Sequence, residues 1–319
     1  MSRAPSRSAR PHAQRKAPRS RAETVRPGLY DEVTQRIVGE LEAGRVPWVQ
    51  PWGTSGCGNA GLPRNAVSRR PYSGINVLIL WSAVIDRAYP SQDWLTFNQA
   101  QKLGGTVRKG ERGVTVVYAD RFTPEDETAR TKGEHEPRSI PFLKRFTVFN
   151  VAQCDGLSAF VADPAPLAEC ETLPLAEAVI RASGVEYRIG GNEAFYAPIF
   201  DFVQVPPPPA FFAPVDYYRT ALHELTHATG HASRVGRDLT HCFGSDGYAR
   251  EELVAELGSA FLCAVLGIAP SLRHADYLAH WLAVLKADNR AIFRAASAAS
   301  KAADWLVARS AATADEAAA

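Results

Sequence analysis

Three histidines and a glutamate lie close together in the segment Tyr217 to His231, which reads YYRTALHELTHATGH. His223 and His227 are four residues apart, so on a helix their side chains lie one turn apart on the same face. Two imidazole nitrogens in that arrangement can hold one zinc ion at about 2.0–2.1 Å. Glu224 is turned by about 100° around the helix axis, where a general base can take a proton from water. The spacing is the H-E-x-x-H pattern of zinc peptidases.

A catalytic zinc site has three protein ligands and one open position, so the sequence must supply a third ligand. The longer pattern H-E-x-x-H-x-x-G-x-x-H is not met, because Ser233 stands where its last histidine belongs and His231 comes too early. The following segment YAREELVAELGSAFL offers Glu252 and Glu256, four residues apart on one helical face. Their pattern E-x-x-A-E resembles that of gluzincins, in which the first acid binds metal and the acid one turn later orients a ligating histidine. This resemblance implies Glu252 as the third ligand and Glu256 as the acceptor of a hydrogen bond from a ligating imidazole. The alternative is that these acids form a solvated helix face.

The expected reaction is metal-assisted hydrolysis of a peptide bond, with Glu224 as the general base. The expected cofactor is one Zn²⁺ ion, with Mn²⁺ or another divalent metal as the alternative. Tyr248 and His231 are candidates for the extra donor that a developing oxyanion needs. The segment DFVQVP, 201–206, is expected to be a strand, either an edge on which an extended peptide substrate pairs or plain sheet structure.

The front half of the chain combines aromatic rings with cations. Four of the six tryptophans lie between Trp48 and Trp94, and residues 62–112 hold eight basic and three acidic residues. Rings that stack on bases, set among cations that follow phosphates, are typical of proteins that bind single-stranded nucleic acid. The candidate contacts are Trp48, Trp52, Arg64, Arg69, Arg70, Tyr72, Arg108, Lys109 and Arg112. The alternative is structural: Trp81 lies in an apolar run typical of a core, and VRKGERG can be an ordinary hairpin turn.

Charge and composition bound the class of protein. The net charge of +2 divides into +7 up to residue 27, +2 over residues 28–160 and −7 from residue 161 onward. A basic front is expected if that part meets a polyanion. The chain shows no run near the roughly 18 apolar residues of a membrane span, so no membrane partner is expected. Five scattered cysteines without a C-x-x-C pair fit a reducing, cytoplasmic location.

The expected fold class is α+β with two domains. Residues 1–27 form a disordered basic arm, residues 28–161 an α+β single-stranded DNA-binding domain, residues 162–174 a linker, and residues 175–319 a mainly helical zincin-like metallopeptidase domain with a small sheet. In the first domain we expect helices near residues 30–44, 74–89 and 96–105 and strands at 113–122 and 143–154. In the second we expect strands at 185–190 and 194–206, then helices at 216–229, 250–266, 274–286 and 288–308.

Several segments together resemble one known family. IVGELEAGRVPWVQPW, PRNAVSRRPYSGINVLILW, WLTFNQAQKLGGTVRKGERG and FTVFNVAQCDGL resemble the N-terminal domain of the ArdC antirestriction proteins, and ALHELTHATGHASR and GYAREELVAELGSAFL resemble that family's zincin-like metallopeptidase domain. The match covers about residues 29–308 and leaves out the arm.

The resemblance implies single-stranded DNA binding by the first domain and a metal site at His223, Glu224, His227 and Glu252 in the second. It also implies carriage on a plasmid or other mobile element, with DNA that enters by conjugation shielded from host restriction, and kinship with the front part of some plasmid primases. Two alternatives remain. One is a metallopeptidase that acts on a host protein and uses the basic domain only for localisation. The other is a non-enzymatic DNA-binding protein with a structural metal.

Overall fold

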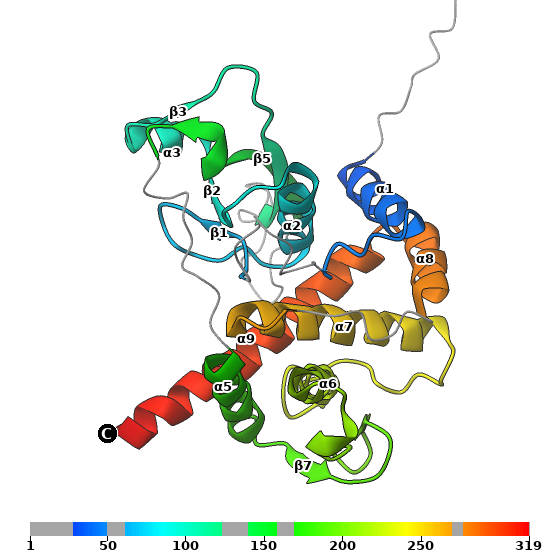
Figure 1. The fold of residues 1–319 in the computed structure, drawn as a ribbon. Helices are drawn as coiled ribbons and strands as arrows, with labels where there is room; N and C mark the ends of the chain where they lie inside the picture. The colour runs from blue at the N-terminus through cyan, green and yellow to red at the C-terminus, as the bar shows by residue number, and fades with distance from the viewer. Residues whose placement is uncertain (1–27, 50–60, 123–139, 158–168, 270–276, 319) are drawn as a thin grey trace, which may run out of the picture.

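A computed structural model describes residues 28–49, 61–122, 140–157, 169–269 and 277–318 (Figure 1). The N-terminal part contains the helices α1 (Leu29–Glu42), α2 (Ile75–Arg87) and α3 (Phe97–Lys102), and the strands β1 (Arg64–Asn65), β2 (Asp93–Leu95), β3 (Thr106–Val107), β4 (Val114–Phe122), β5 (Ile140–Asn150) and β6 (Cys154–Asp155). The short 3-10 helix η1 (Val151–Gln153) follows β5. Helices α1, α2 and α3 and strand β4 lie where they were expected. The strand expected at 143–154 is wrong at its end, because β5 stops at Asn150 and η1 follows, and β1, β2 and β3 were not predicted.

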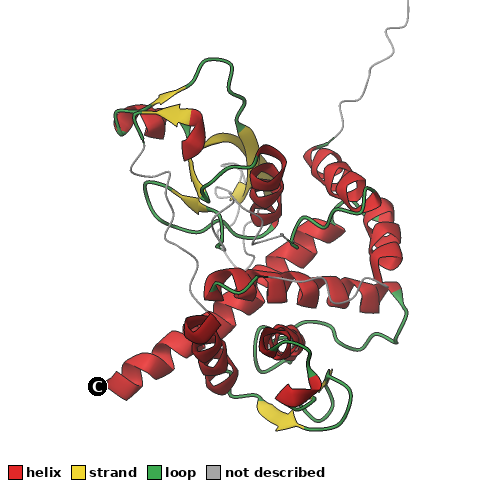
Figure 2. Cartoon of the chain, viewed as in Figure 1, coloured by secondary structure: helices red, strands yellow, loops and turns green. Residues whose placement is uncertain are grey.

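The C-terminal part is mainly helical, as Figure 2 shows. Its helices are α5 (Glu169–Ala182), α6 (Pro214–Ala228), α7 (Asp246–Leu266), α8 (Leu278–Ala287) and α9 (Ala291–Ala318), and its strands are β7 (Glu186–Ile189), β8 (Phe195–Ala197) and β9 (Phe202–Val205). A 3-10 turn, η3 (Pro208–Ala210), separates β9 from α6. The α+β fold class is confirmed. Helix α5 begins at Glu169, so its first turns occupy residues expected to lie in the linker.

The N-terminal strands form a mixed sheet in the order β1-β2-β5-β4, and β3 pairs with β6 in a two-stranded sheet. Strands β4 and β5 make a long antiparallel hairpin in which Val114 opposes Val148 and Phe122 opposes Ile140. The side-chain amide of Asn76 in α2 donates to the Val117 carbonyl and accepts from the Val117 N–H, at 2.7 and 2.8 Å. This amide satisfies backbone groups at the edge of β4 and so joins α2 to the sheet.

The C-terminal sheet corrects two expectations about residues 194–206. The expected single strand is a hairpin, because the backbone reverses at Asp201, whose φ of 54° lies in the left-handed region. The order β7-β9-β8 then puts β9 in the centre. Of the two alternatives for DFVQVP, the edge strand is therefore wrong and the plain sheet strand is confirmed, and the edge beside β9 is β8.

Helices α6 and α7 approach each other closely. A Cβ atom added to Gly258 of α7 would lie 2.4 Å from the Thr226 side chain of α6, so only glycine fits there. The small residue lets the two backbones approach until side chains of α7 reach those of α6. Helix α7 begins at the N-cap Ser245, whose hydroxyl accepts from the Tyr248 N–H, and ends at Gly267 in the left-handed conformation.

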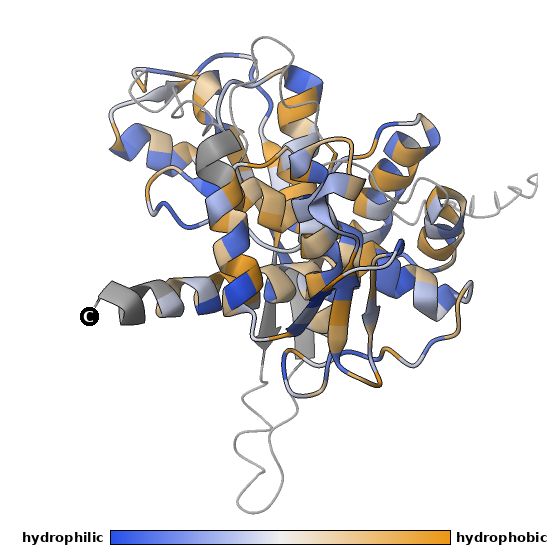
Figure 3. Cartoon of the chain, turned by 60° about the horizontal axis from the view of Figure 1, so that its bottom comes forward, coloured by the Kyte–Doolittle hydropathy of each residue, from blue (hydrophilic) through white to orange (hydrophobic). Residues whose placement is uncertain are grey.

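The two parts of the chain share one hydrophobic core. Trp48 packs edge-to-face on Trp281 of α8 with ring centroids 5.9 Å apart, and Trp81 of α2 packs on Phe261 of α7 at 5.6 Å. Helix α1 packs on α8, and α2 packs on α9, which also contacts α7 and α5 (Figure 1). The helices carry apolar and polar stretches side by side in Figure 3, as expected for helices that bury one face. Among the described residues, no helix is both long and apolar enough for a membrane span.

Candidate metal centre

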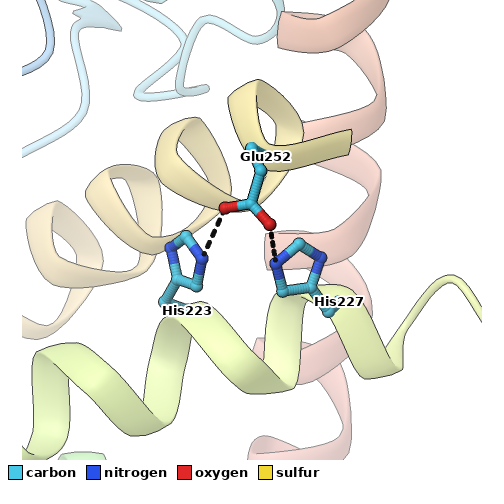
Figure 4. A group of neighbouring side chains, drawn as sticks. All are labelled: His223, His227 and Glu252. Atoms are coloured by element: carbon cyan, nitrogen blue, oxygen red, sulfur yellow. Dashed lines mark ion pairs between the residues drawn. The ribbon is translucent and has the colours of Figure 1, made fainter. Parts of the chain in front are cut away.

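His223, His227 and Glu252 converge at the contact between α6 and α7 (Figure 4). One oxygen of Glu252 lies 3.5 Å from Nε2 of His223, and the other lies 3.5 Å from Nε2 of His227. One ligand atom from each residue can be chosen so that all three lie within 4.8 Å of one another. His223 and Glu252 are buried and His227 is nearly so. The spacing that predicted two imidazoles on one face and a carboxylate on the next helix matches this geometry.

The spacing of the three side chains leaves room for a shared ion. Charge-assisted hydrogen bonds between nitrogen and carboxylate oxygen are about 2.7–2.9 Å long, shorter than the 3.5 Å found here. One ligand atom from each residue lies within 4.8 Å of the other two. Two imidazoles and one carboxylate are also the donor set of many catalytic zinc sites. The residues present therefore fit a divalent metal ion.

A second layer of carboxylates orients the two imidazoles. Nδ1 of His227 lies 3.2 Å from Oε1 of Glu251, and Nδ1 of His223 lies 3.7 Å from Oε2 of Glu256. Glu256 therefore lies close to the His223 ring, but 3.7 Å is too long for the hydrogen bond that was expected, and its role stays a prediction. Burial by itself lowers the pKa of His227, but the carboxylates of Glu251 and Glu252 outweigh it and raise that pKa to about 10. Acids on both sides of the rings make this site attractive to a cation.

Arg237 holds the second layer in place. Its guanidinium donates to both oxygens of Glu251 at 3.0 and 2.8 Å, and to the Thr226 carbonyl at the end of α6 at 2.7 Å. Burial would raise the pKa of Glu251, but His227 and Arg237 lower it, so the carboxylate stays charged. Sequence reasoning missed both residues. Glu251 carried a weak signal, since it precedes the predicted ligand, whereas Arg237 carried none.

A cavity of about 940 Å³ opens over the three ligand residues. Glu224 lines it beside the imidazoles, as the expected base requires. Tyr248 also lines it, and burial, followed by the charge of Glu252, raises the pKa of its hydroxyl. His231 is not among the described residues that line the cavity; its Nδ1 lies 2.7 Å from Ser233 Oγ. The structure therefore brings Tyr248 to the site but not His231.

Apolar side chains form the mouth of the cavity. Ile199, in the turn between β8 and β9, is 91% exposed, and Phe243, before α7, is 81% exposed. Phe195 of the edge strand β8 lines the same cavity. These residues gave no sequence signal, because their role depends on loops that only the fold brings together.

The expected DNA contacts fare differently from one another. Trp48 is fully buried against Trp281, so the expectation of a surface stacking ring is wrong. Its ring is part of the core that the two parts of the chain share. Trp52 lies outside the described residues. Tyr72 is half-buried, packs on the core, and burial raises its pKa. None of these three is an exposed ring in the described structure.

The expected cations lie on the surface but several are paired. Arg64 and Arg69 both donate to Asp93, at 2.8 and 3.0 Å. Arg108 donates to Glu111 at 2.9 Å and to a backbone carbonyl. Three further expected cations are exposed: Arg70, Lys109 and Arg112. The six remain candidate phosphate contacts.

Comparisons with known proteins agree with this architecture. Residues 27–149 match a family described as the N-terminal domain of anti-restriction factor ArdC, and residues 174–298 match a family described as zincin-like metallopeptidase. The fold and site are thus those of a zincin-like protein with an ArdC-type N-terminal domain.

Solved structures and curated relatives extend the match. The crystal structure of metal-free antirestriction protein ArdC from plasmid R388 is 40% identical, covers 89% of this chain and 98% of its own, and superposes with a TM-score of 0.75. Its Mn(II)-bound structure gives a TM-score of 0.74 at 39% identity. The uncharacterized protein y4eC of Sinorhizobium fredii (strain NBRC 101917 / NGR234) is 40% identical over 87% of this chain and 91% of its own length. This chain belongs to the ArdC antirestriction family.

A longer relative shows the same unit in another setting. The DNA primase TraC of Escherichia coli is 36% identical over 90% of this chain, but the match spans only 28% of TraC. Nearly the whole of this chain therefore corresponds to a minor part of that primase.

Proposed function

We propose that this protein binds single-stranded DNA through its N-terminal part, carries a metal-dependent peptidase site in its C-terminal part, and protects incoming DNA from host restriction. The observation that carries the peptidase proposal is the convergence of His223, His227 and Glu252 beside Glu224 in one cavity. The antirestriction role is supported by the family, whose solved relatives are named antirestriction proteins.

His223, His227 and Glu252 would hold the metal ion, and Glu224 would handle the proton. A bound divalent ion supplies Lewis-acid chemistry: it polarises a carbonyl oxygen and lowers the pKa of water. Glu224 takes a proton from the attacking water and returns it to the leaving amine. Zn²⁺ is the ion we propose, since two imidazoles and a carboxylate suit it; the Mn(II)-bound relative supports a divalent ion but leaves zinc as the proposal.

Two features of the site would assist the reaction. Tyr248, at the cavity wall, is the candidate donor to the developing oxyanion. The second layer formed by Glu251, Glu256 and Arg237 would keep the imidazoles in one orientation, which spares the site from reorganising during the reaction.

Support for DNA binding comes from the N-terminal family match and from the exposed cations Arg70, Lys109 and Arg112. Cations of this kind follow a phosphate backbone and release counterions, so the affinity should fall as salt rises. An affinity that does not change with salt would argue against these contacts.

Glu224→Gln tests the peptidase proposal. The variant keeps the three ligand residues, so it should bind metal like the unchanged protein, while cleavage of a denatured casein probe should fall by about 10²–10⁴-fold. Equal cleavage by both proteins would remove Glu224 from the mechanism. DNA protection is then assayed in the same variant: retained protection would show that the peptidase chemistry is dispensable for antirestriction, and lost protection would join the two.

A further inference from the structure

Of the three aromatic residues first considered for base stacking, Trp48 is buried, Tyr72 is half-buried and Trp52 lies outside the described residues, which raises the question of where a base could stack. Among the described residues of the N-terminal part, 28–157, the exposed aromatic side chains are Phe97, Tyr118 and Phe146. Two of them, Tyr118 and Phe146, lie in ring contact on neighbouring strands, with centroids 6.4 Å apart at 77°. We infer that Tyr118 and Phe146 form a stacking surface for the bases of single-stranded DNA. This inference rests on the DNA binding proposed above.

The strand register explains why the two rings meet. Phe146 of β5 opposes Val116 of β4, and Tyr118 opposes Lys144. Tyr118 and Phe146 are therefore diagonal neighbours on one face of the hairpin, within reach of each other as large side chains are. Two rings attached to paired strands are held in place before any ligand binds, so little conformational entropy is lost on binding.

The exposure of the rings is unusual for this face. Val114, Val116 and Val148 share the face and are buried, at 5%, 4% and 2%. Farther along the hairpin the same face carries the aromatic side chains of Tyr118 and Phe146, which are 55% and 46% exposed. Adjacent exposed rings of this size commonly mark an interaction site rather than ordinary surface.

The charges around the rings favour a polyanion. In the hairpin, the charged residues whose side chains the structure describes are Lys144 and Arg145, and both are cationic. Lys144 is exposed directly across from Tyr118. Arg145 projects from the opposite face of the hairpin, because side chains alternate along a strand, and it pairs there with Glu32 of α1 at 3.0 Å. Lys144 is therefore the cation beside the rings, and rings beside a cation suit single-stranded DNA, because each base offers a flat face and each nucleotide a phosphate.

Substitution of the rings tests the inference directly. Binding of a fluorescein-labelled oligodeoxythymidylate is measured by anisotropy over a salt series with the full chain and with Tyr118→Ala, Phe146→Ala and the double variant. Loss of one stacked base should weaken binding by roughly five- to a hundredfold, with the slope of log affinity against log salt unchanged. Tyr118→Trp, which keeps an aromatic ring at this position, should bind the oligonucleotide as tightly as the unchanged protein. Phe212→Ala, which removes a fully exposed ring from the loop before α6, should leave it unchanged.

The outcomes separate the two levels of the proposal. If the full chain binds the oligonucleotide and both alanine variants bind equally well, the stacking surface is wrong while DNA binding stands. If the full chain does not bind, both are wrong. Photocrosslinking of a bromodeoxyuridine oligonucleotide gives an independent readout: crosslinks on β4 or β5 support the site, and crosslinks confined elsewhere overturn it. Thermal melting of each variant checks that a lost affinity does not reflect unfolding.

Discussion

The metal centre and the N-terminal ring surface are built in opposite ways. At the candidate metal centre, His223 and Glu252 are 1% and 4% exposed, and the carboxylates of Glu251 and Glu256 lie 3.2 and 3.7 Å from the imidazoles. On the hairpin, Tyr118 and Phe146 are about half exposed on a sheet. Each buried polar group needs its hydrogen-bond or ion-pair partner at a fixed position, so substitution of any one of these residues should have a large effect on metal binding. An exposed surface sums several weaker contacts, so single changes should reduce binding without abolishing it.

The contrast between the two regions would be contradicted most strongly if Trp48 contacted DNA instead of packing in the core. We expect Trp48→Ala to lower the free energy of unfolding by about 3–5 kcal/mol, because it leaves a cavity against Trp281. Chemical denaturation measures this. Phe212→Ala serves as the control for loss of an exposed ring. Unchanged stability together with weaker DNA binding would return Trp48 to the surface.

Removal of a metal ligand should have the next largest effect. Glu252→Gln should weaken metal binding by more than the roughly 10–100-fold typical of outer-layer residues. Titration with Zn²⁺ against a chromogenic chelator measures this, and Glu256→Gln is the matched control, with the smaller loss. At metal concentrations about 1,000 times Kd, the unchanged protein should gain about 4 kcal/mol of stability, and Glu252→Gln should lose that gain. Equal affinities in the two variants would show that Glu252 is not a ligand.

Arg237 sharpens the comparison, because it tests whether the metal centre depends on residues that touch no metal. Arg237→Ala should weaken Zn²⁺ affinity by about 10–100-fold through Glu251 and His227. Arg234→Ala is a matched control. Arg234 also binds a carbonyl of α6, that of Ala228, but its carboxylate partner is Asp201. If both variants lost the same affinity, the effect would be general loosening of the helix end.

The smallest expected effect concerns pH. Burial would raise the pKa of Asp201, but hydrogen bonds from Arg234 and Tyr196 lower it below its ordinary value of 3.8. A carboxyl group with a lowered folded-state pKa stabilises the protein above the unfolded pKa, and this contribution is lost as pH falls through the folded value. Asp201→Asn should therefore flatten the acid limb of stability against pH, whereas the exposed control Asp155→Asn should not. If Asp201→Asn and the unchanged protein lost stability identically as pH falls, Asp201 would not contribute to the pH dependence of stability.

The sequence was most informative where function depends on helical spacing. His223, Glu224 and His227 follow the period of one helix, and Glu252 follows from a ligand pattern on the next, so the grouping of His223, His227 and Glu252 was predictable, while their roles stay predictions. Glu256 was also foreseen, but Arg237 was not, because its partner Glu251 is reached through a loop whose path no local pattern specifies.

Aromatic composition was a poorer guide. A tryptophan between prolines looks like a surface residue, but Trp48 packs against a helix more than two hundred positions later in the chain. Long-range packing of that kind overrides local character. The strand at 194–206 failed for a related reason: a continuous β-rich run does not reveal that Asp201 takes a left-handed conformation and turns the chain back.

The packing of α1 on α8 and of α2 on α9 has a consequence for synthesis in the cell. A chain emerges from the ribosome N-terminus first, and domains generally fold as units when they are complete. Here α1 and α2 precede their partners α8 and α9 by more than 200 residues, so their apolar faces stay open until those helices have been made. A nascent chain stalled before α8 should therefore remain sensitive to protease along both halves and become resistant only once α8 and α9 have emerged.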